Sequence, residues 1–153
     1  GTLKQAMHPD MKIEVEGAVA RVTRPTDDRM HRSLHGLTRT LVNNMVLGVT
    51  GGFQKTLQVD GLGYKVAVQG NQLVIQGIFT HPLIIDIPSG IGVAVEKQNL
   101  VMIKGADKQL VGQFAAGIRA MKRVDPYKGK GIKYLDEHIR RKVGKTSTGA
   151  AAK

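Results

Sequence analysis

The stretch KVAVQGNQLVIQ, residues 65–76, is the part of the chain that best indicates its fold. Apolar and polar residues alternate on both sides of the dipeptide Gly70-Asn71, and a period of two is typical of strands with one buried face. The alternating apolar residues are Val66, Val68, Leu73 and Ile75. Because Gly-Asn favours a tight two-residue turn, the stretch predicts an antiparallel hairpin.

Further strands and a helix are predicted on either side of this hairpin. Strand patterns include Leu57 and Val59 and the ranges 83–87, 93–96 and 100–104. Asp107 follows as a helix cap, and the apolar face predicted for this helix is Leu110, Phe114, Ile118 and Met121. The helix must end before Asp125-Pro126, because the residue that precedes proline disfavours helical backbone angles.

The first fifty residues repeat this order on a smaller scale. Ile13, Val15, Val19 and Val22 indicate two strands. Residues 26–28 then have the composition of a helix cap with acids in the first turn, and a helix is predicted to end near Gly48. Its apolar stripe is Met30, Leu34, Leu37, Leu41 and Met45.

A shift of 80 residues superposes the two halves without a gap, with Val15 on Val95, Asp27 on Asp107 and Arg39 on Arg119. We interpret this as a weak internal duplication. The predicted fold is α+β, with two related small domains, each an antiparallel-rich sheet covered by one helix, and a basic C-terminal extension. The expected boundaries are 1–50, 51–124 and 125–153, with the first domain short of its opening strands.

Positive charge is concentrated at the C-terminal end. Residues 119–153 contain 11 Lys and Arg against 3 acidic residues, which is +8 of the formal +11. Such a segment is typical of a protein with a polyanionic partner, and nucleic acid is the obvious candidate, because binding releases its condensed counterions. A membrane surface is the rival, but the segment lacks the apolar face of an interfacial helix. The remaining alternative is a solvated tail that only increases solubility.

Composition excludes several other classes of protein. The chain has no Cys, which excludes disulfides and thiolate chemistry and fits a reducing compartment. No apolar run has the length of about 20 residues that spans a bilayer. The N-terminus has no secretory pattern, so a cytoplasmic location is the default expectation.

The most distinctive motif is PYKGKGIKY, residues 126–134. Gly129 and Gly131 have no Cβ and let the backbone approach a phosphate chain, while Lys128 and Lys130 supply charge. The two tyrosines can stack on exposed bases. The following DEHIRRK, residues 136–142, places cations in several directions. The alternative interpretation is a mobile surface loop.

Three weaker motifs are rejected. Gly144-Lys145-Thr146 resembles the end of a nucleotide-binding loop, but Ile139 stands where the first glycine is needed. His31 and His35 have the spacing of zinc ligands, yet neighbouring cations disfavour a metal, so we expect exposed or RNA-facing histidines. Gly61-Leu62-Gly63-Tyr64 lacks the third glycine of a dinucleotide loop and indicates a bulge or bend instead. We therefore predict no enzyme, no metal, no cofactor and no small-molecule substrate.

Residues 125–132 together with the residues around 134–137 and 140–145 resemble the bacterial large-subunit ribosomal proteins of the L6 family. The likeness covers essentially the whole chain apart from the Ala-rich end, and it includes residues 8–11, 23–25, 34–41, 61–64, 81–82 and 107–112. Val124 departs from the family's Pro or Ser. Gly1-Thr2-Leu3 matches the second half of a hairpin, so about two of the family's N-terminal strands are expected to be absent.

The resemblance implies a structural constituent of the large ribosomal subunit that binds its ribosomal RNA near the docking region of translation factors, beside neighbouring ribosomal proteins. The RNA-binding residues carried over from the family are Tyr127, Lys128, Gly129, Lys130, Gly131 and Lys133, extended to Arg140, Arg141, Lys142 and Lys145. The alternative is a nucleic-acid-binding regulator that acts off the ribosome.

Overall fold

The computed structural model describes residues 1–145, and the chain divides into two compact units. Unit 1 comprises Gly1–Phe53 with Ala106–Lys108, and unit 2 comprises Gln54–Gly105 with the residues from Gln109 onward. Both contain strands and a helix, and all of the pairings between strands given below are antiparallel, which confirms the predicted α+β class.

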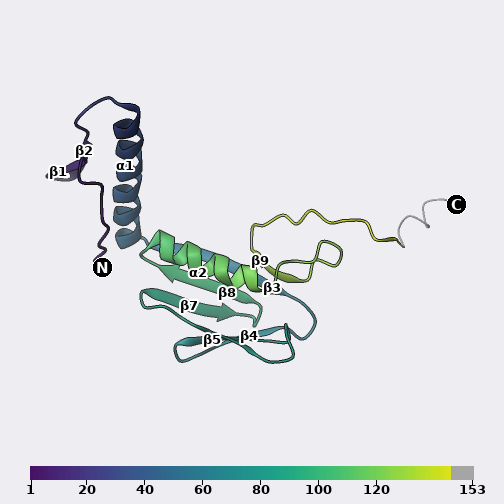
Figure 1. Ribbon diagram of the computed structural model, residues 1–153. Helices are drawn as coiled ribbons and strands as arrows, with labels where there is room; N and C mark the ends of the chain where they lie inside the picture. Colours follow the sequence, from purple (N-terminus) through teal and green to yellow (C-terminus); the bar gives the residue numbers. More distant parts are fainter. Residues whose placement is uncertain (146–153) are drawn as a thin grey trace. The chain divides into compact units, whose positions relative to one another are not determined.

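Unit 1 is a hairpin followed by a long helix (Figure 1). Strands β1 (Lys12–Glu16) and β2 (Val19–Thr23) pair antiparallel, with Glu16 opposite Val19. Gly17 takes a positive φ of 60° in the connecting turn, an angle that glycine adopts without steric cost. Helix α1 (Arg29–Thr50) extends slightly beyond the predicted end.

The start of α1 differs from its prediction. Asp28 is the N-cap residue, but its side chain makes no capping hydrogen bond, and the first turn contains no acidic residue. Asp27 is instead paired with Arg24 at 2.7 Å, and Thr26 Oγ1 bonds to His31 Nδ1 at 2.6 Å. Both acids lie before the helix because the helix begins at Arg29.

Few side chains of unit 1 are buried. Met11, Thr38 and Gly48 are its buried residues among those described. The apolar stripe predicted along α1 is only partly covered, since Leu37 is 55% exposed and Met30 is 64% exposed. The prediction of a helix was therefore confirmed, whereas the assignment of these two residues to the buried face was wrong.

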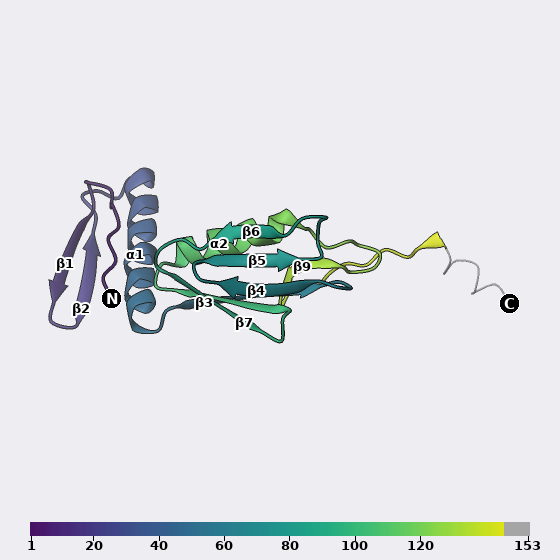
Figure 2. The same ribbon diagram turned by 90° about the horizontal axis from the view of Figure 1, so that it is seen from below.

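Unit 2 contains two sheets (Figures 1 and 2). The first has the order β7-β8-β3-β9 and the second the order β4-β5-β6. The strands are β3 (Phe53–Asp60), β4 (Lys65–Gln69), β5 (Gln72–Gln76), β6 (Leu83–Asp86), β7 (Ile91–Glu96), β8 (Leu100–Gly105) and β9 (Gly131–Tyr134). The β4–β5 hairpin confirms the first prediction, with Gln69 opposite Gln72 and a positive φ at Gly70.

Helix α2 (Lys108–Met121) ends before Pro126 as expected, but it buries a different row of residues. Val111, Ala115 and Ile118 are buried, and they join a cluster from both sheets that includes Leu57 and Ile132. Apolar side chains occur on two adjacent rows of the helix, so periodicity alone did not show which row faces the core. Of the predicted face, only Ile118 is fully buried.

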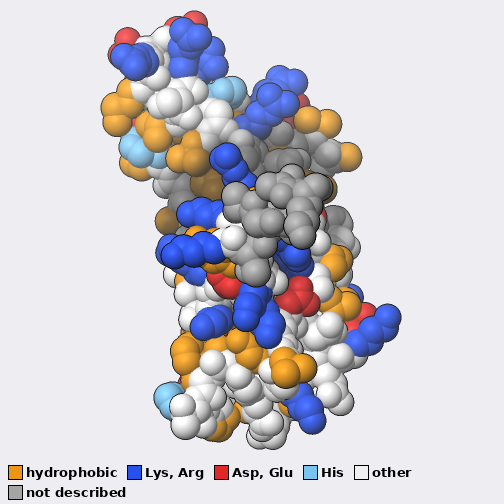
Figure 3. Space-filling model, turned by 90° about the vertical axis from the view of Figure 1, so that its right-hand side faces the viewer, with side chains coloured by type: hydrophobic (Ala, Val, Ile, Leu, Met, Phe, Trp, Pro, Cys, Tyr) orange, Lys and Arg blue, Asp and Glu red, His pale blue; other side chains and the backbone are white. Residues whose placement is uncertain are grey.

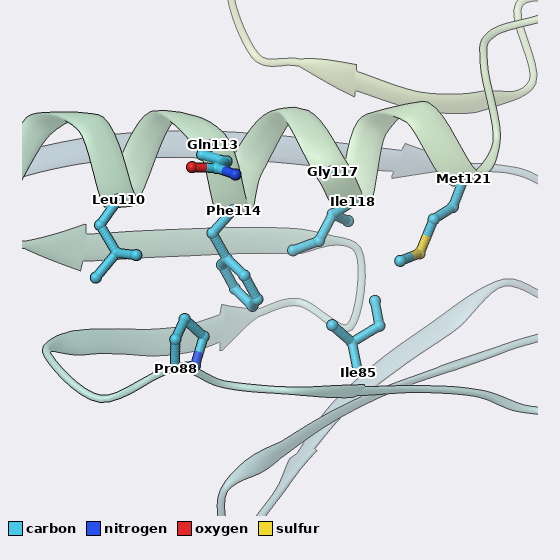
Figure 4. Close-up of a pocket in the computed structure, with 8 residues that line it drawn as sticks. All are labelled: Ile85, Pro88, Leu110, Gln113, Phe114, Gly117, Ile118 and Met121. Atoms are coloured by element: carbon cyan, nitrogen blue, oxygen red, sulfur yellow. The ribbon is translucent and has the colours of Figure 1, made fainter.

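The other predicted residues of α2 line an open hollow of about 380 Å³ (Figure 4). Leu110, Phe114 and Met121 lie on its helical side, and Ile85 and Pro88 lie opposite. The lining is mainly apolar, and Phe114 and Ile85 also pack against the buried cluster, so this second row of the helix lies at the edge of the core and is only partly buried.

The predicted shift of 80 residues also relates the observed elements. Adding 80 to the bounds of β1 gives 92–96, which falls within β7, and adding 80 to the start of α1 gives 109, one residue past the start of α2. A hairpin followed by a helix therefore occurs once in each unit.

Strand β9 was missed by sequence reasoning. It pairs antiparallel with β3, with Val59 opposite Ile132, and it lies at one edge of the four-stranded sheet. The predicted extension from residue 125 onward therefore contains a strand of the sheet. Residues 146–153 of that predicted extension lie outside the described part of the chain.

Candidate nucleic-acid interface

The residues 125–130 form a closed turn between α2 and β9. The backbone N–H of Gly129 donates to the carbonyl of Asp125 at 2.9 Å, and the N–H of Asp125 donates to the carbonyl of Lys130 at 2.9 Å. The Asp125 carboxylate accepts from the backbone N–H of Lys128 at 3.0 Å and of Tyr127 at 3.2 Å. These two hydrogen bonds, and chiefly the one from Lys128, hold the pKa of Asp125 below its ordinary value of 3.8. The charged Asp125 carboxylate thus stabilises the turn by accepting hydrogen bonds from its backbone.

Gly129 makes room for an arginine that arrives from farther along the chain. It has a φ of +73°, and a Cβ there would lie 3.0 Å from Arg141 Nη2. The N–H of Lys142 donates to the carbonyl of Pro126 at 2.9 Å, so this later segment lies along the turn. The fold therefore brings Arg141 and Lys142 beside a turn that carries two exposed lysines, Lys128 and Lys130.

Gly131 has a different role from the one predicted. It is buried, with a φ of +143°, and a Cβ would meet Val124 Cα at 2.7 Å and the Arg123 carbonyl oxygen at 2.8 Å. The close approach at this glycine is made by the chain's own backbone. An open backbone for a phosphate, which the sequence suggested, is therefore not available at Gly131.

Two further predicted residues are engaged inside unit 2. Lys133 Nζ lies 2.9 Å from an Asp60 carboxylate oxygen, and its side chain is only 22% exposed. Tyr134 is half-buried, with Lys55 Nζ 5.6 Å and the Arg119 guanidinium 5.8 Å from its ring centroid. Lys133 therefore has a carboxylate partner, and Tyr134 is a packing residue of β9 in this structure.

A charge pair fixes the segment that follows β9. The Arg119 guanidinium donates two hydrogen bonds to the Glu137 carboxylate, and the backbone N–H of Tyr134 donates to it at 3.1 Å. The bonds from Arg119 are the main reason that the pKa of Glu137 lies below its ordinary value of 4.5, and they raise the pKa of Arg119. Sequence reasoning did not single out this pair, since its two members are 18 positions apart.

Most of the predicted interface residues remain at the surface. Those that are exposed are Tyr127, Lys128, Lys130, Arg140, Arg141, Lys142 and Lys145. Figure 3 looks from the side toward which the C-terminal segment runs in Figure 1, and it shows Lys and Arg side chains on that face with acidic and apolar side chains among them. We call these exposed residues, together with Gly129, the cationic surface.

An open hollow of about 440 Å³ borders the cationic surface. Gly129, Arg141 and Lys133 line it together with Glu137, His138 and Ile139. The polar lining and the neighbouring cations suit an anionic group. Among residues 1–145, no group of three or more His, Cys, Asp or Glu side chains is arranged to hold a metal ion.

The rejected motifs have structural positions of their own. His35 Nε2 lies 2.9 Å from the Val22 carbonyl oxygen and His31 Nε2 lies 3.6 Å from an Asp10 carboxylate oxygen. Both histidines are half-buried, so the expectation of exposed side chains was wrong, and both contact other residues of unit 1. Of the motif Gly144-Lys145-Thr146, the threonine lies outside the described residues. Neither helix of the described chain has the length and apolar character needed to cross a bilayer.

Comparison with known proteins identifies the family. The family model described as ribosomal protein L6 matches residues 1–52 and 61–135. A protein of Carboxydothermus hydrogenoformans named large ribosomal subunit protein uL6 is 55% identical over 146 residues, which is 95% of this chain and 80% of that protein. Proteins of the same name from Clostridium acetobutylicum and Chloroflexus aggregans are 52% and 50% identical, over 82% and 81% of their lengths. The chain therefore belongs to the ribosomal protein L6 family.

Proposed function

We propose that this protein is a structural constituent of the large ribosomal subunit and binds large-subunit ribosomal RNA through unit 2 and the cationic surface. The family supports the first part, because its members are ribosomal proteins, which are structural rather than enzymatic. Location in the cytoplasmic ribosome follows from the same relationship. Proximity to translation factors and to neighbouring ribosomal proteins belongs to this proposal.

The observation that carries RNA binding is the separation of cations from acids around the turn. Asp125 is occupied by backbone N–H groups and Glu137 by Arg119. Within the described chain, Lys128 and Lys130 have no carboxylate within ion-pair distance. Lys128 and Lys130 are therefore able to form ion pairs with an external anion.

A phosphate backbone is the anion that fits this arrangement. Cations from two segments of the chain lie side by side, so they can bind successive phosphates and release condensed counterions. Exposed Tyr127, at the start of the turn, can hydrogen-bond to a sugar or stack on an unpaired base. We also infer that the two units derive from one hairpin–helix motif, of which unit 2 is the RNA-binding copy.

The test replaces Lys128 and Lys130 together by glutamine and measures binding to large-subunit ribosomal RNA over a series of salt concentrations. Each lost phosphate contact flattens the plot of log K against log salt by about 0.7 to 0.9, so we expect a change of at most about 1.8. The matched control replaces Lys65 and Lys104, exposed lysines on β4 and β8, in the same way.

An unchanged slope in the K128Q/K130Q variant would contradict phosphate contact by these two residues. Whether the protein is a constituent of the large subunit is tested separately by sedimentation. A constituent remains with the large particle through a high-salt wash, and a protein that is released by the wash does not fit the proposal.

A further inference from the structure

The loop between β5 and β6 presents an exposed aromatic pair. Phe79 is 43% exposed, and its ring lies nearly parallel to that of His81, with centroids 6.2 Å apart and an interplanar angle of 17°. This is a stacked arrangement of two rings. His81 is exposed as well, so the pair presents aromatic surface to the surroundings.

The base of this loop is held by backbone packing. Gly77 has a φ of +85°, and its missing Cβ leaves room for the backbone of Gly63 and Tyr64. Ile75 pairs with Leu83 where the two strands meet the loop. The aromatic pair therefore stands on a fixed support within unit 2.

A cation links the aromatic pair to the cationic surface. Lys122 Nζ lies 6.0 Å from the centroid of the Phe79 ring. The carbonyl of the same Lys122 accepts the backbone N–H of Ile132 at 2.9 Å, just after the turn that carries Lys128 and Lys130. Figure 2 shows the β5–β6 loop at the end of unit 2 toward which α2 runs. The aromatic pair thus lies beside Lys122, and the backbone of Lys122 is hydrogen-bonded to the strand that follows the turn.

We propose that Phe79 and His81 form a stacking site for an unpaired RNA base and that Lys122 binds a phosphate next to that base. The inference rests on the proposed function, because it assumes that RNA reaches the cationic surface. A base has a flat face that continues the stack of the two rings, and the adjacent nucleotide supplies a phosphate to Lys122. An apolar anchor from a protein partner instead favours a desolvated pocket, whereas this pair lies open beside a cation.

The absence of tryptophan from the chain makes the site directly observable. In the full chain, the F79W variant keeps an aromatic ring and introduces a single indole fluorophore. We expect large-subunit ribosomal RNA from a bacterial relative, and a short single-stranded oligoribonucleotide, to quench its emission. A duplex of the same length leaves the emission unchanged, since its bases are already paired.

The F79L variant keeps apolar bulk and removes the aromatic face. We expect its affinity for the ribosomal RNA to fall by about 5- to 100-fold, as for the loss of one stacked base, with an unchanged salt slope. The control is I84T, which changes an exposed apolar residue on neighbouring β6 and should leave the affinity unchanged. Thermal unfolding of each variant checks that the fold is retained.

An F79L affinity within twofold of wild type would overturn the inference, as would F79W emission that RNA does not quench or that duplex quenches equally. The failure of the two proposals can be told apart. If K128Q/K130Q flattens the salt dependence while F79L binds normally, only the stacking site is wrong. If the wild-type protein binds no ribosomal RNA, the proposed function fails as well.

Discussion

The two units contain the same hairpin–helix motif, but they differ in how many further strands pack against it. In unit 1, β1, β2 and α1 leave few buried residues, and long apolar side chains such as Leu37 stay largely exposed. In unit 2, β3 and β9 continue the sheet beside β8, and residues of the second sheet complete a large buried cluster. A helix on a two-stranded hairpin is thus insufficient for a core, and additional strands supply the missing apolar surface.

The comparison makes its strongest prediction for a pair of leucines. We expect Leu57→Ala in β3 to lower the free energy of unfolding by about 3 kcal/mol, because a fully buried side chain leaves a cavity. Leu37→Ala in α1 should cost about 0.5 kcal/mol or less, because that side chain is already in water. Urea denaturation followed by circular dichroism measures both, and equal losses would remove the distinction between the units.

The second prediction compares two glycines with positive φ. Gly131→Ala should cost about 2 kcal/mol, since its Cβ would collide with the backbone of Arg123 and Val124. A Cβ at Gly17, in the unit 1 turn, would meet nothing within 4 Å. Gly17→Ala should therefore lower the free energy of unfolding by about 1 kcal/mol, from backbone strain alone. Thermal unfolding gives the two values, and a larger loss at Gly17 would show that crowding at Gly131 is relieved at little cost.

The smallest effect is expected for an ion pair and depends on pH. Glu137→Gln should cost about 1 kcal/mol near pH 7, a value reduced by partial exposure of Arg119. Because the pKa of folded Glu137 is lowered, its stabilisation is fully present above the ordinary value of 4.5 and is lost as the pH falls through the lower folded value.

The matched control for this pair is Asp27→Asn in unit 1, where the carboxylate paired with Arg24 is 84% exposed. We expect no measurable change there, since exposed pairs are screened by water and salt. Denaturation at pH 7 and again below pH 4 measures both variants. A Glu137→Gln deficit that persists unchanged at the lower pH would contradict the ion pair as its cause.

Much of the secondary structure could be predicted because the spacing of apolar residues differs between strands and helices. The Gly70-Asn71 hairpin and the end of α2 before Pro126 are examples. Strand β9 could not be found in this way. It has four residues with one fully buried side chain, Ile132, and the lysines around it suggested a solvated segment. Its place in the sheet depends on pairing with β3, more than 70 positions earlier.

Only part of the candidate site could be predicted, because contacts between residues distant along the chain leave no local pattern. Exposed residues such as Lys128 and Arg141 were found from charge, which is visible in the sequence. The partners that engage Lys133 and Glu137 are Asp60 and Arg119, which are distant along the chain. Gly131 was misinterpreted because a glycine required for close backbone packing looks the same in the sequence as one that is open to a ligand.

The short edge strand β9 has a kinetic consequence. It begins at the residue after Lys130, and the turn before it is closed by hydrogen bonds at both ends, so the backbone entropy of the turn is lost during folding. Under the proposed function, a polyanion therefore meets Lys128 and Lys130 on an ordered backbone, and only their side chains lose freedom on binding. On that proposal, we expect association with this turn to be limited by diffusion and orientation rather than by loop closure.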